Sequence, residues 1–201
     1  MPRPSSSKPL VAPISTVLFV PNSGPLENDP HESNIPAGKH FTDMPAPGTV
    51  ALLQQPPGLL TAVLGDIMAS RFHMRGVRGV VANGRVRDIG PIGHLCATQT
   101  TQAEDGSSMP FTVWSKGTST VGPALQCRAW CANTPLMIGE LEVKPGDFVY
   151  TDETERGVVI IPQEKAEEVV QILPGFKDRD DLRVADVQTG MSIIETVKRH
   201  P

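Results

Sequence analysis

The sequence predicts a mixed α/β fold. Several short runs are rich in Val, Leu and Ile and are bounded by Gly, Pro, Asn or Asp, a pattern typical of buried strands. One later and longer segment repeats apolar residues at helical spacing. The 201 residues are enough to bury a sizeable core, and because aromatic residues make up only 4% of the chain, that core must consist mainly of Val, Leu, Ile and Ala.

The first half of the chain contains three predicted strands and one predicted helical stretch. Val17–Val20 and Thr49–Leu53 read as strands on either side of a polar loop rich in Pro, Asn and Asp. Gly79–Ala82 reads as a buried strand that ends in a turn at Asn83-Gly84. A helical stretch is predicted from residues that recur at helical spacing, with an interruption at Gly65: Leu60, Val63, Leu64, Ile67, Met68 and Arg71.

The last third contains a predicted hairpin followed by two predicted helices. A turn at Pro145-Gly146-Asp147 precedes Phe148–Asp152, and Glu153–Gly157 connects that strand to Val158–Pro162. Ala166, Val169, Val170 and Leu173 form one apolar helical stripe, whereas Glu164, Lys165, Glu167 and Glu168 are expected to face water. Gly190 is expected to stop this helix, and Ser192–Glu195 fits a capping box that opens the next one.

Charge and hydropathy exclude several classes of protein. The formal net charge of −4 and the pI near 5.7 argue against non-specific nucleic-acid binding, which requires basic surface. No apolar run reaches the ~18 residues needed to span a bilayer, and the start has no apolar core of a signal peptide. We therefore expect a cytoplasmic protein with neither a nucleic-acid nor a membrane partner.

The three cysteines, Cys96, Cys127 and Cys131, are interpreted as reduced thiols without a role. Cys127 and Cys131 have a spacing that would place them one turn apart on a helix, but a zinc site needs about four ligands, and no histidine pair lies near them. His94 is the histidine nearest in sequence to Asp88. It is interpreted either as a proton donor in a modified site or as a loop histidine without a role.

The candidate site consists of Asp66 and, later in the chain, the two consecutive residues Arg87 and Asp88. Carboxylates suit Mg²⁺ or Mn²⁺, and Mg²⁺ takes only one or two protein carboxylates beside water. Arg87 has a planar fork of donors that matches a substrate carboxylate. The pair follows the predicted strand Gly79–Ala82, where sites of α/β folds commonly lie. By spacing alone, a solvated surface pair is the other interpretation.

Gly65 has two interpretations. A helix that starts near Gly65 would offer the amides of Ile67 and Met68 to a substrate carboxylate. Alternatively, Gly65 only allows close packing.

A set of motifs runs along most of the chain after about Val11: Ile35–His40, P-G-T-V, Q-P-P-G-L-L-T-A-V-L-G-D-I-M-A-S-R, R-G-V-R-G-V-V-A-N-G-R-V-R-D, Lys116–Gly122, K-P-G-D-F-V-Y-T-D, G-V-V-I-I-P-Q-E-K-A-E-E-V and G-M-S-I-I-E-T. Together these motifs resemble the RraA-like family, which includes class II 4-hydroxy-4-methyl-2-oxoglutarate aldolases and oxaloacetate decarboxylases. The sequence looks most similar to those of fungal members.

The resemblance implies a role for each site residue. Asp88 matches the aspartate that binds the metal, Mg²⁺ or Mn²⁺, and Arg87 matches the arginine that binds substrate. Asp66 matches the acid that acts through a metal-bound water. Gly65, Ile67 and Met68 match the segment whose backbone receives the substrate carboxylate.

The resemblance also implies a fold and an assembly. The fold would be a three-layer β/β/α sandwich similar to swivelling phosphohistidine domains, here as one domain over residues 11–201 after a disordered polar start at 1–10. Members are typically homotrimers in which a neighbouring subunit contributes a glutamate to the site. The candidates for that glutamate are Glu153, Glu155 and Glu164.

The chain departs from the family pattern in three places. The family usually begins with a longer helical segment, so the polar start indicates a shortened N-terminus. Ile89-Gly90-Pro91 follows Asp88, where many members continue with two residues and then an acid. Residues 98–108 look like an insertion, expected as a surface loop or as a lid beside the site.

Three functions follow as hypotheses. The first is a divalent-metal lyase that cleaves a carbon–carbon bond of a 2-oxo acid through a metal-stabilised enolate. The second is a member recruited to a specialised substrate, for example in secondary metabolism. The third is a protein-binding regulator, because the namesake of the family regulates an RNase by contact.

Overall fold

The computed structural model describes residues 9–25, 30–102, 106 and 108–201. It divides the chain into two compact units, Met1–Pro162 and Gln163–Pro201, which are considered separately below. Of the start expected to be disordered, residues 1–8 lie outside the described residues, and Leu10 is buried in the first strand. One domain over residues 11–201 stays a prediction.

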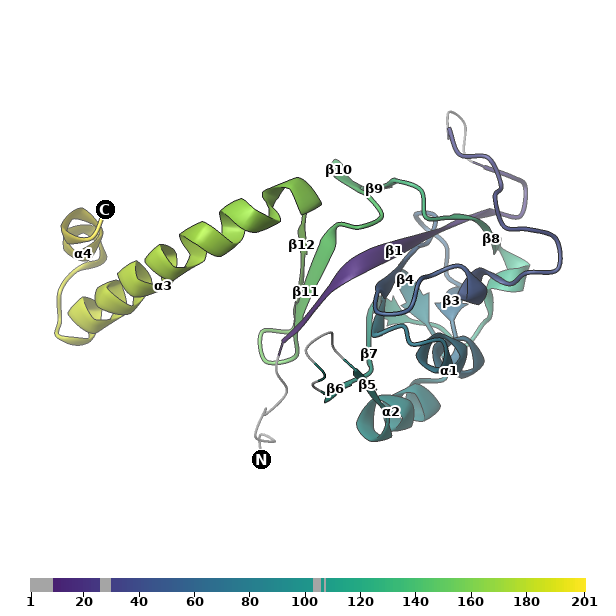
Figure 1. The fold of residues 1–201 in the computed structure, drawn as a ribbon, viewed down its shortest axis with the longest axis horizontal. Helices are drawn as coiled ribbons and strands as arrows, with labels where there is room; N and C mark the ends of the chain where they lie inside the picture. The colour runs from purple at the N-terminus through teal and green to yellow at the C-terminus, as the bar shows by residue number, and fades with distance from the viewer. Residues whose placement is uncertain (1–8, 26–29, 103–105, 107) are drawn as a thin grey trace. The chain divides into compact units, whose positions relative to one another are not determined.

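A mixed sheet of eight strands organises the first unit (Figure 1). Its order is β12-β11-β1-β2-β4-β3, with β7 also paired to β4 and β8 to β1. The pairs β1–β2, β2–β4, β3–β4 and β4–β7 are parallel, whereas β1–β11, β1–β8 and β11–β12 are antiparallel. The strands are β1 (Leu10–Pro21), β2 (Val50–Gln54), β3 (Ala62–Leu64), β4 (Gly79–Val86), β7 (Thr112–Thr118), β8 (Cys127–Ala132), β11 (Phe148–Asp152) and β12 (Gly157–Ile161).

The sheet is buried on both faces, and β2 shows how. Ala51 and Leu53 join one apolar cluster, whereas Val50 and Leu52 join a second cluster on the opposite face. Successive strand residues point to opposite faces, so a continuous apolar run is what a strand covered on both sides requires. The expected mixed α/β class, with a central mixed sheet and helices, is therefore confirmed.

Two helices cover the first face of the sheet, α1 (Asp66–Met74) and α2 (Ile89–Thr98), and they lie side by side in Figure 1. Ala69, Phe72 and Ile92 point from them into the first cluster. The 3-10 helix η1 (Phe41–Asp43) adds Phe41, whose ring meets Phe72 edge-on at a centroid distance of 6.0 Å. A second 3-10 helix, η2 (Pro123–Leu125), precedes β8.

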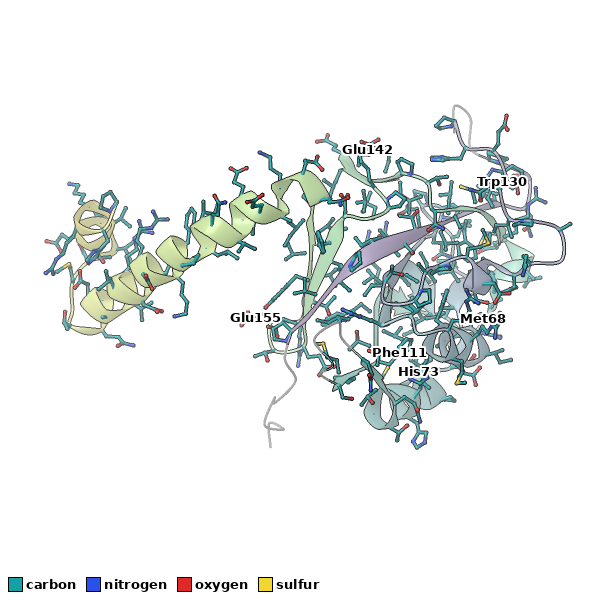
Figure 2. The ribbon with its side chains drawn as sticks, in the orientation of Figure 1. Met68, His73, Phe111, Trp130, Glu142 and Glu155 are labelled. Carbon is teal, nitrogen blue, oxygen red and sulfur yellow. The ribbon has the colours of Figure 1, made fainter. Side chains whose placement is uncertain are left out.

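Small hairpins and the β11–β12 pair complete the first unit. The insertion at 98–108 was expected to be a loop, but its described residues include the ends of a hairpin, β5 (Thr100–Gln102) with β6 (Ser108–Pro110). Figure 2 shows His73 and Phe111 pointing toward one another beside this hairpin, at a ring-centroid distance of 5.5 Å. The predicted hairpin β11–β12 is confirmed. A further hairpin joins β9 (Leu136–Ile138) and β10 (Leu141–Val143).

The helical stretch predicted from Leu60 to Arg71 was half wrong. Ala62–Leu64 forms β3 and helix begins only at Asp66. All three residues of β3 are buried, because the strand pairs with β4 beyond the end of β2. Pairing with β4 satisfies the backbone of this short segment and overrides its helical spacing.

The turn predicted at Asn83-Gly84 was also wrong, because β4 continues through both residues to Val86. Asn83 still pairs with Gln54 of β2. A Cβ atom on Gly84 would lie 2.6 Å from Cβ of Gln55. Glycine is therefore needed here for close approach within the sheet rather than for a turn.

The helical placement of Cys127 and Cys131 was wrong as well. Both lie buried in β8, which runs antiparallel to β1. None of the three cysteines forms a disulfide bond among the described residues. Burial raises the pKa of the Cys96 thiol, and likewise the pKa of the Cys127 thiol, which disfavours the reactive thiolate.

The second unit contains the 3-10 helix η3 (Gln163–Lys165) and the helices α3 (Ala166–Gln188) and α4 (Ile193–Arg199). The stop at Gly190 (φ 97°) and the capping box of Ser192 with Glu195 are confirmed. Asp186 of α3 holds α4 by accepting from Arg199 (3.2 Å) and lying 3.0 Å from His200 Nε2. No residue of α3 is buried, and none of the described helices is long and apolar enough to cross a membrane.

Replacing Phe72 with Ala should lower the free energy of unfolding by about 3–5 kcal/mol, because the ring is fully buried. Urea unfolding followed by circular dichroism measures the change. Met74→Ala is the matched control on the same helix. Its side chain is 76% exposed, so we expect a change below about 0.5 kcal/mol. Equal losses in the two variants would contradict the described packing of α1.

The Asp43 carboxylate joins η1 to α1 in a pH-dependent way. It accepts from Arg71 Nε (3.0 Å) and Nη2 (2.7 Å), and these bonds hold the pKa of Asp43 below its ordinary value. A lowered pKa gives stability that is present above the ordinary pKa and lost as pH falls through the folded value. Asp43→Asn should destabilise by less than about 1 kcal/mol at neutral pH. Urea titrations should show this difference shrinking below about pH 4, and a constant difference would refute the linkage.

Candidate active site

The candidate site begins where β4 ends. Arg87 and Asp88 connect Val86, the last residue of β4, to α2, and the backbone N–H of Arg87 donates to the Leu64 carbonyl of β3 (2.9 Å). The pair therefore lies at the carboxyl ends of parallel strands, as the sequence predicted. Asp88 has φ 56° and ψ 44°, a left-handed conformation that costs free energy in a residue other than glycine.

The carboxylate of Asp88 does not cap α2, although Asp88 is the residue that precedes the helix. Its Oδ2 atom lies 3.3 Å from Arg87 Nε and accepts from the backbone N–H of Asp66 at 3.4 Å. The side chains of Arg87 and Asp88 are 35% and 34% exposed, so both reach solvent. The left-handed turn therefore directs the carboxylate toward the start of α1.

Gly65 allows these groups to meet. A Cβ atom at Gly65 would lie 2.6 Å from Asp88 Oδ2 and 2.9 Å from Arg87 Nε, closer than real side chains approach. Its φ of −128° is ordinary extended backbone, so the requirement is for space and not for an unusual conformation. On the other side, a Cβ atom at Gly122 would lie 3.4 Å from Arg87 Nη1. Gly65 therefore allows close packing, as the second interpretation expected, and it immediately precedes α1.

Asp66 is the first residue of α1, and its Oδ1 atom accepts from the backbone N–H of Ile67 at 2.7 Å. The Ile67 side chain is 72% exposed, whereas Met68 packs against the first apolar cluster. The first amides of a helix lack intrahelical partners and favour negative charge. The helix start predicted near Gly65 is thus confirmed, and the carboxylate-binding role of its amides stays a prediction.

A hollow of about 460 Å³ lies beside Arg87 and Asp88. Besides these two and Ile89, it is lined by Thr118, Ser119 and Thr120. Thr118 ends β7, Ser119 and Thr120 follow it, and the Ser119 N–H donates to the Val86 carbonyl at 2.9 Å. Sequence reasoning did not assign these hydroxyls to the site, although they belong to the Lys116–Gly122 motif.

The other candidate residues lie on other elements. Glu153 and Glu155 lie in the connection between β11 and β12, and Glu164 lies in η3 of the second unit. His94 is an exposed residue of α2 rather than of a loop, so that part of its interpretation was wrong. Among the described residues, no three His, Cys, Asp or Glu side chains form a cluster that could hold a metal ion.

The family model described as RraA-like, Aldolase/RraA, matches residues 2–160. The chain belongs to the RraA-like family. A provisionally named 4-hydroxy-4-methyl-2-oxoglutarate aldolase of Ectopseudomonas mendocina is 29% identical over 66% of this chain and 71% of its own length. The chain spans about half the length of two further relatives that it matches.

Solved structures agree on the fold of this RraA-like chain. An uncharacterised protein of Pseudomonas syringae pv. tomato is similar with a TM-score of 0.67 at 20% identity, over 95% of this chain and 79% of that one. A Streptomyces coelicolor protein, described as an unusual member of the RNase ES inhibitor RraA family, is similar with a TM-score of 0.63 at 24% identity, over 87% and 76%. These likenesses support the mixed α/β architecture of the family.

Gly65→Ala should lower the free energy of unfolding by about 1–3 kcal/mol, because the added methyl group overlaps the Asp88 carboxylate. Gly90→Ala, at the second residue of α2, is the control. A Cβ atom there meets nothing within 4 Å, and alanine should stabilise the helix by up to about 1 kcal/mol. Urea unfolding distinguishes the two, and a neutral Gly65→Ala would show that the Arg87-Asp88 turn is free to move away.

Proposed function

We propose that this RraA-like chain is a lyase that cleaves a carbon–carbon bond of a 2-oxo acid. The reaction is retro-aldol cleavage of a substrate like 4-hydroxy-4-methyl-2-oxoglutarate, decarboxylation of oxaloacetate, or both. One observation carries the proposal: Arg87 and Asp88, at the end of β4, meet the start of α1 at Gly65 and Asp66. The provisional aldolase name of the Ectopseudomonas mendocina relative supports this reaction class.

Two groups would hold the substrate carboxylate. The Arg87 guanidinium lies between Gly65 and Gly122, and a planar fork of donors suits a bidentate carboxylate. The first amides of α1, at Ile67 and Met68, add partial positive charge from the helix terminus. Together they would orient the 2-oxo group toward Asp88.

A divalent cation, Mg²⁺ or Mn²⁺, fits Asp88 by the chemistry of its donors. One partly exposed carboxylate beside an open hollow offers the few protein oxygens that Mg²⁺ prefers, with room for water to complete the coordination. When bound, the cation would supply Lewis acidity to the 2-oxo oxygen as negative charge develops. The strained conformation of Asp88 is consistent with a functional demand on its carboxylate.

Asp66 would move the proton. In both reactions the bond between C3 and C4 breaks, and its electron pair becomes the enolate of pyruvate. Retro-aldol cleavage also requires removal of the proton from the C4 hydroxyl, whereas decarboxylation releases carbon dioxide. Asp66 would carry the hydroxyl proton away or return a proton to C3, acting through water when it is not in direct contact.

The assembly is part of the proposal. The apolar side chains of α3, with Val170 69%, Leu173 55% and Phe176 48% exposed, support burial against other copies in a homo-oligomer. A trimer would allow Glu153, Glu155 or Glu164 to reach a neighbour's site. A three-layer β/β/α arrangement and a cytoplasmic location belong to the same proposal.

Two alternative functions, an enzyme for a specialised substrate and a non-enzymatic binding protein, are each supported by one observation. The hairpin β5–β6, which overlaps the insertion, packs beside α2, the helix that directly follows Asp88, so it could adapt the site to a specialised substrate. The exposed apolar face of α3 would equally suit a non-enzymatic protein partner.

Purified protein should release pyruvate from 4-hydroxy-4-methyl-2-oxoglutarate or oxaloacetate with Mg²⁺ or Mn²⁺, and release should stop with EDTA. Asp88→Asn and Arg87→Gln should each lower kcat/KM by about 10²-fold or more, the effect expected for loss of a charge stabiliser. Lactate dehydrogenase coupling measures pyruvate, with correction for decarboxylation by free metal.

Asp178→Asn in α3 makes the same charge change outside the site and should leave kcat/KM unchanged. No pyruvate from either substrate, with folded wild-type protein, would refute the two named reactions. Full activity in Asp88→Asn would refute the metal role.

A further inference from the structure

A second cavity, of about 490 Å³, lies at the same edge of the sheet as the candidate site but is lined by other residues. Three adjacent parallel strands contribute polar side chains to it. Gln54 ends β2, Asn83 is its register partner in β4, and Lys116 of β7 falls between the partners of Ala82 and Arg85. The edge formed by the carboxyl ends of parallel strands is where α/β folds bind ligands.

The cavity carries positive charge without a counter-charge. Arg85 and Lys116 both line it, and none of its described lining residues is acidic. Within the described part of the chain, neither side chain has a carboxylate within 4.0 Å; the pairs that do form all lie elsewhere. Two cations close together are unfavourable unless an anion joins them.

The donors are held in place. Arg85 Nη1 donates to the Thr118 carbonyl at 3.0 Å, which orients the guanidinium and leaves its other N–H groups for a ligand. Gln55 is buried and fixes the wall: its Oε1 accepts from the Arg85 backbone N–H at 2.9 Å and its Nε2 donates to the Thr61 carbonyl. Gly84 permits this, since any side chain there would overlap Gln55.

Asn83 adds a neutral donor. Its Nδ2 atom donates one hydrogen to Gln54 Oε1, which fixes the orientation of the amide and leaves the second hydrogen. The rest of the lining includes the apolar side chains of Pro56, Leu59 and Met137 and no acidic side chain. A fixed arginine, a flexible lysine and an amide donor are the groups that bind oxyanions.

We propose that the cavity lined by Arg85, Lys116 and Asn83 binds a small oxyanion at a site distinct from that of Arg87 and Asp88. The two sites adjoin, because the Thr118 carbonyl that orients Arg85 belongs to a residue lining the hollow beside Arg87. The oxyanion is either a free anion or the distal carboxylate of a dicarboxylic 2-oxo acid held by Arg87. The anion site itself does not depend on the proposed lyase activity.

Isothermal titration calorimetry with inorganic phosphate at constant ionic strength tests the site. The wild-type chain should bind with a Kd of about 1 mM, the range expected for a solvent-exposed pair of cations. Lys116→Gln should weaken binding roughly five- to tenfold through loss of one charged hydrogen bond. Lys116→Arg should restore it to within about twofold of wild type, since the charge is kept.

Two controls locate the site. Lys144→Gln removes a lysine that pairs with Glu142 at 3.4 Å outside the cavity, and phosphate affinity should not change. Arg87→Gln should also leave it unchanged. Circular dichroism and the urea midpoint establish that Lys116→Gln is folded, as expected for an exposed side chain.

Competition identifies the source of the anion. Displacement of phosphate by 2-oxoglutarate but not by pyruvate would assign the cavity to a distal carboxylate, and failure of both to displace it would assign the cavity to a free anion. Three results would overturn the proposal: no heat up to tens of millimolar phosphate, equal affinity in Lys116→Gln, or loss of binding in Arg87→Gln alone. None of these measurements uses turnover, so a failed lyase assay would leave the result interpretable.

Discussion

The absence of a side chain at Gly65 is the constraint on which the candidate site depends. The end of β4 and the start of α1 come from segments twenty residues apart, and they can touch only because no Cβ atom stands between them. That contact places Asp88 Oδ2 against both Arg87 Nε and the Asp66 N–H. The two-sided burial of β2 and β4 then holds the junction rigid, since both strands pack on each face.

Cationic side chains line two neighbouring cavities at the same edge of the sheet, Arg87 in one and Arg85 with Lys116 in the other. Arg87 has a carboxylate beside it and faces hydroxyl groups, whereas Arg85 has none within reach among the described residues and shares its cavity with Lys116. Residues two apart on β4 thus serve different cavities, and Gly84 and Gly65 are the positions at which the backbone comes close enough to build each one. Sheet pairing explains why both sites lie at one edge.

Much of this could be predicted where local pattern and long-range pairing agree. The strands β1, β2 and β11–β12, the start of α1 and the capping box at Ser192 follow from apolar runs and cap chemistry. β3 could not be predicted, because pairing with β4 holds its three residues as a strand although Val63 and Leu64 follow helical spacing. Likewise, Asn83-Gly84 resembles a turn until Gln54 is known to pair with it. The hydroxyl groups of Thr118–Thr120 lie at the site because β7 pairs with β4. Residue spacing in the sequence does not indicate that pairing.

The hydrogen bond from the Ile67 N–H to Asp66 Oδ1 has a consequence for any anion that binds at the start of α1. That amide is already occupied by the chain's own carboxylate, so an incoming carboxylate must replace Asp66 rather than fill a vacant position. The displaced Asp66 side chain would then be free to move next to the bound anion. Binding of an anion at the start of α1 would therefore also release the Asp66 carboxylate. Without a bound anion, that carboxylate stays hydrogen-bonded to the Ile67 N–H.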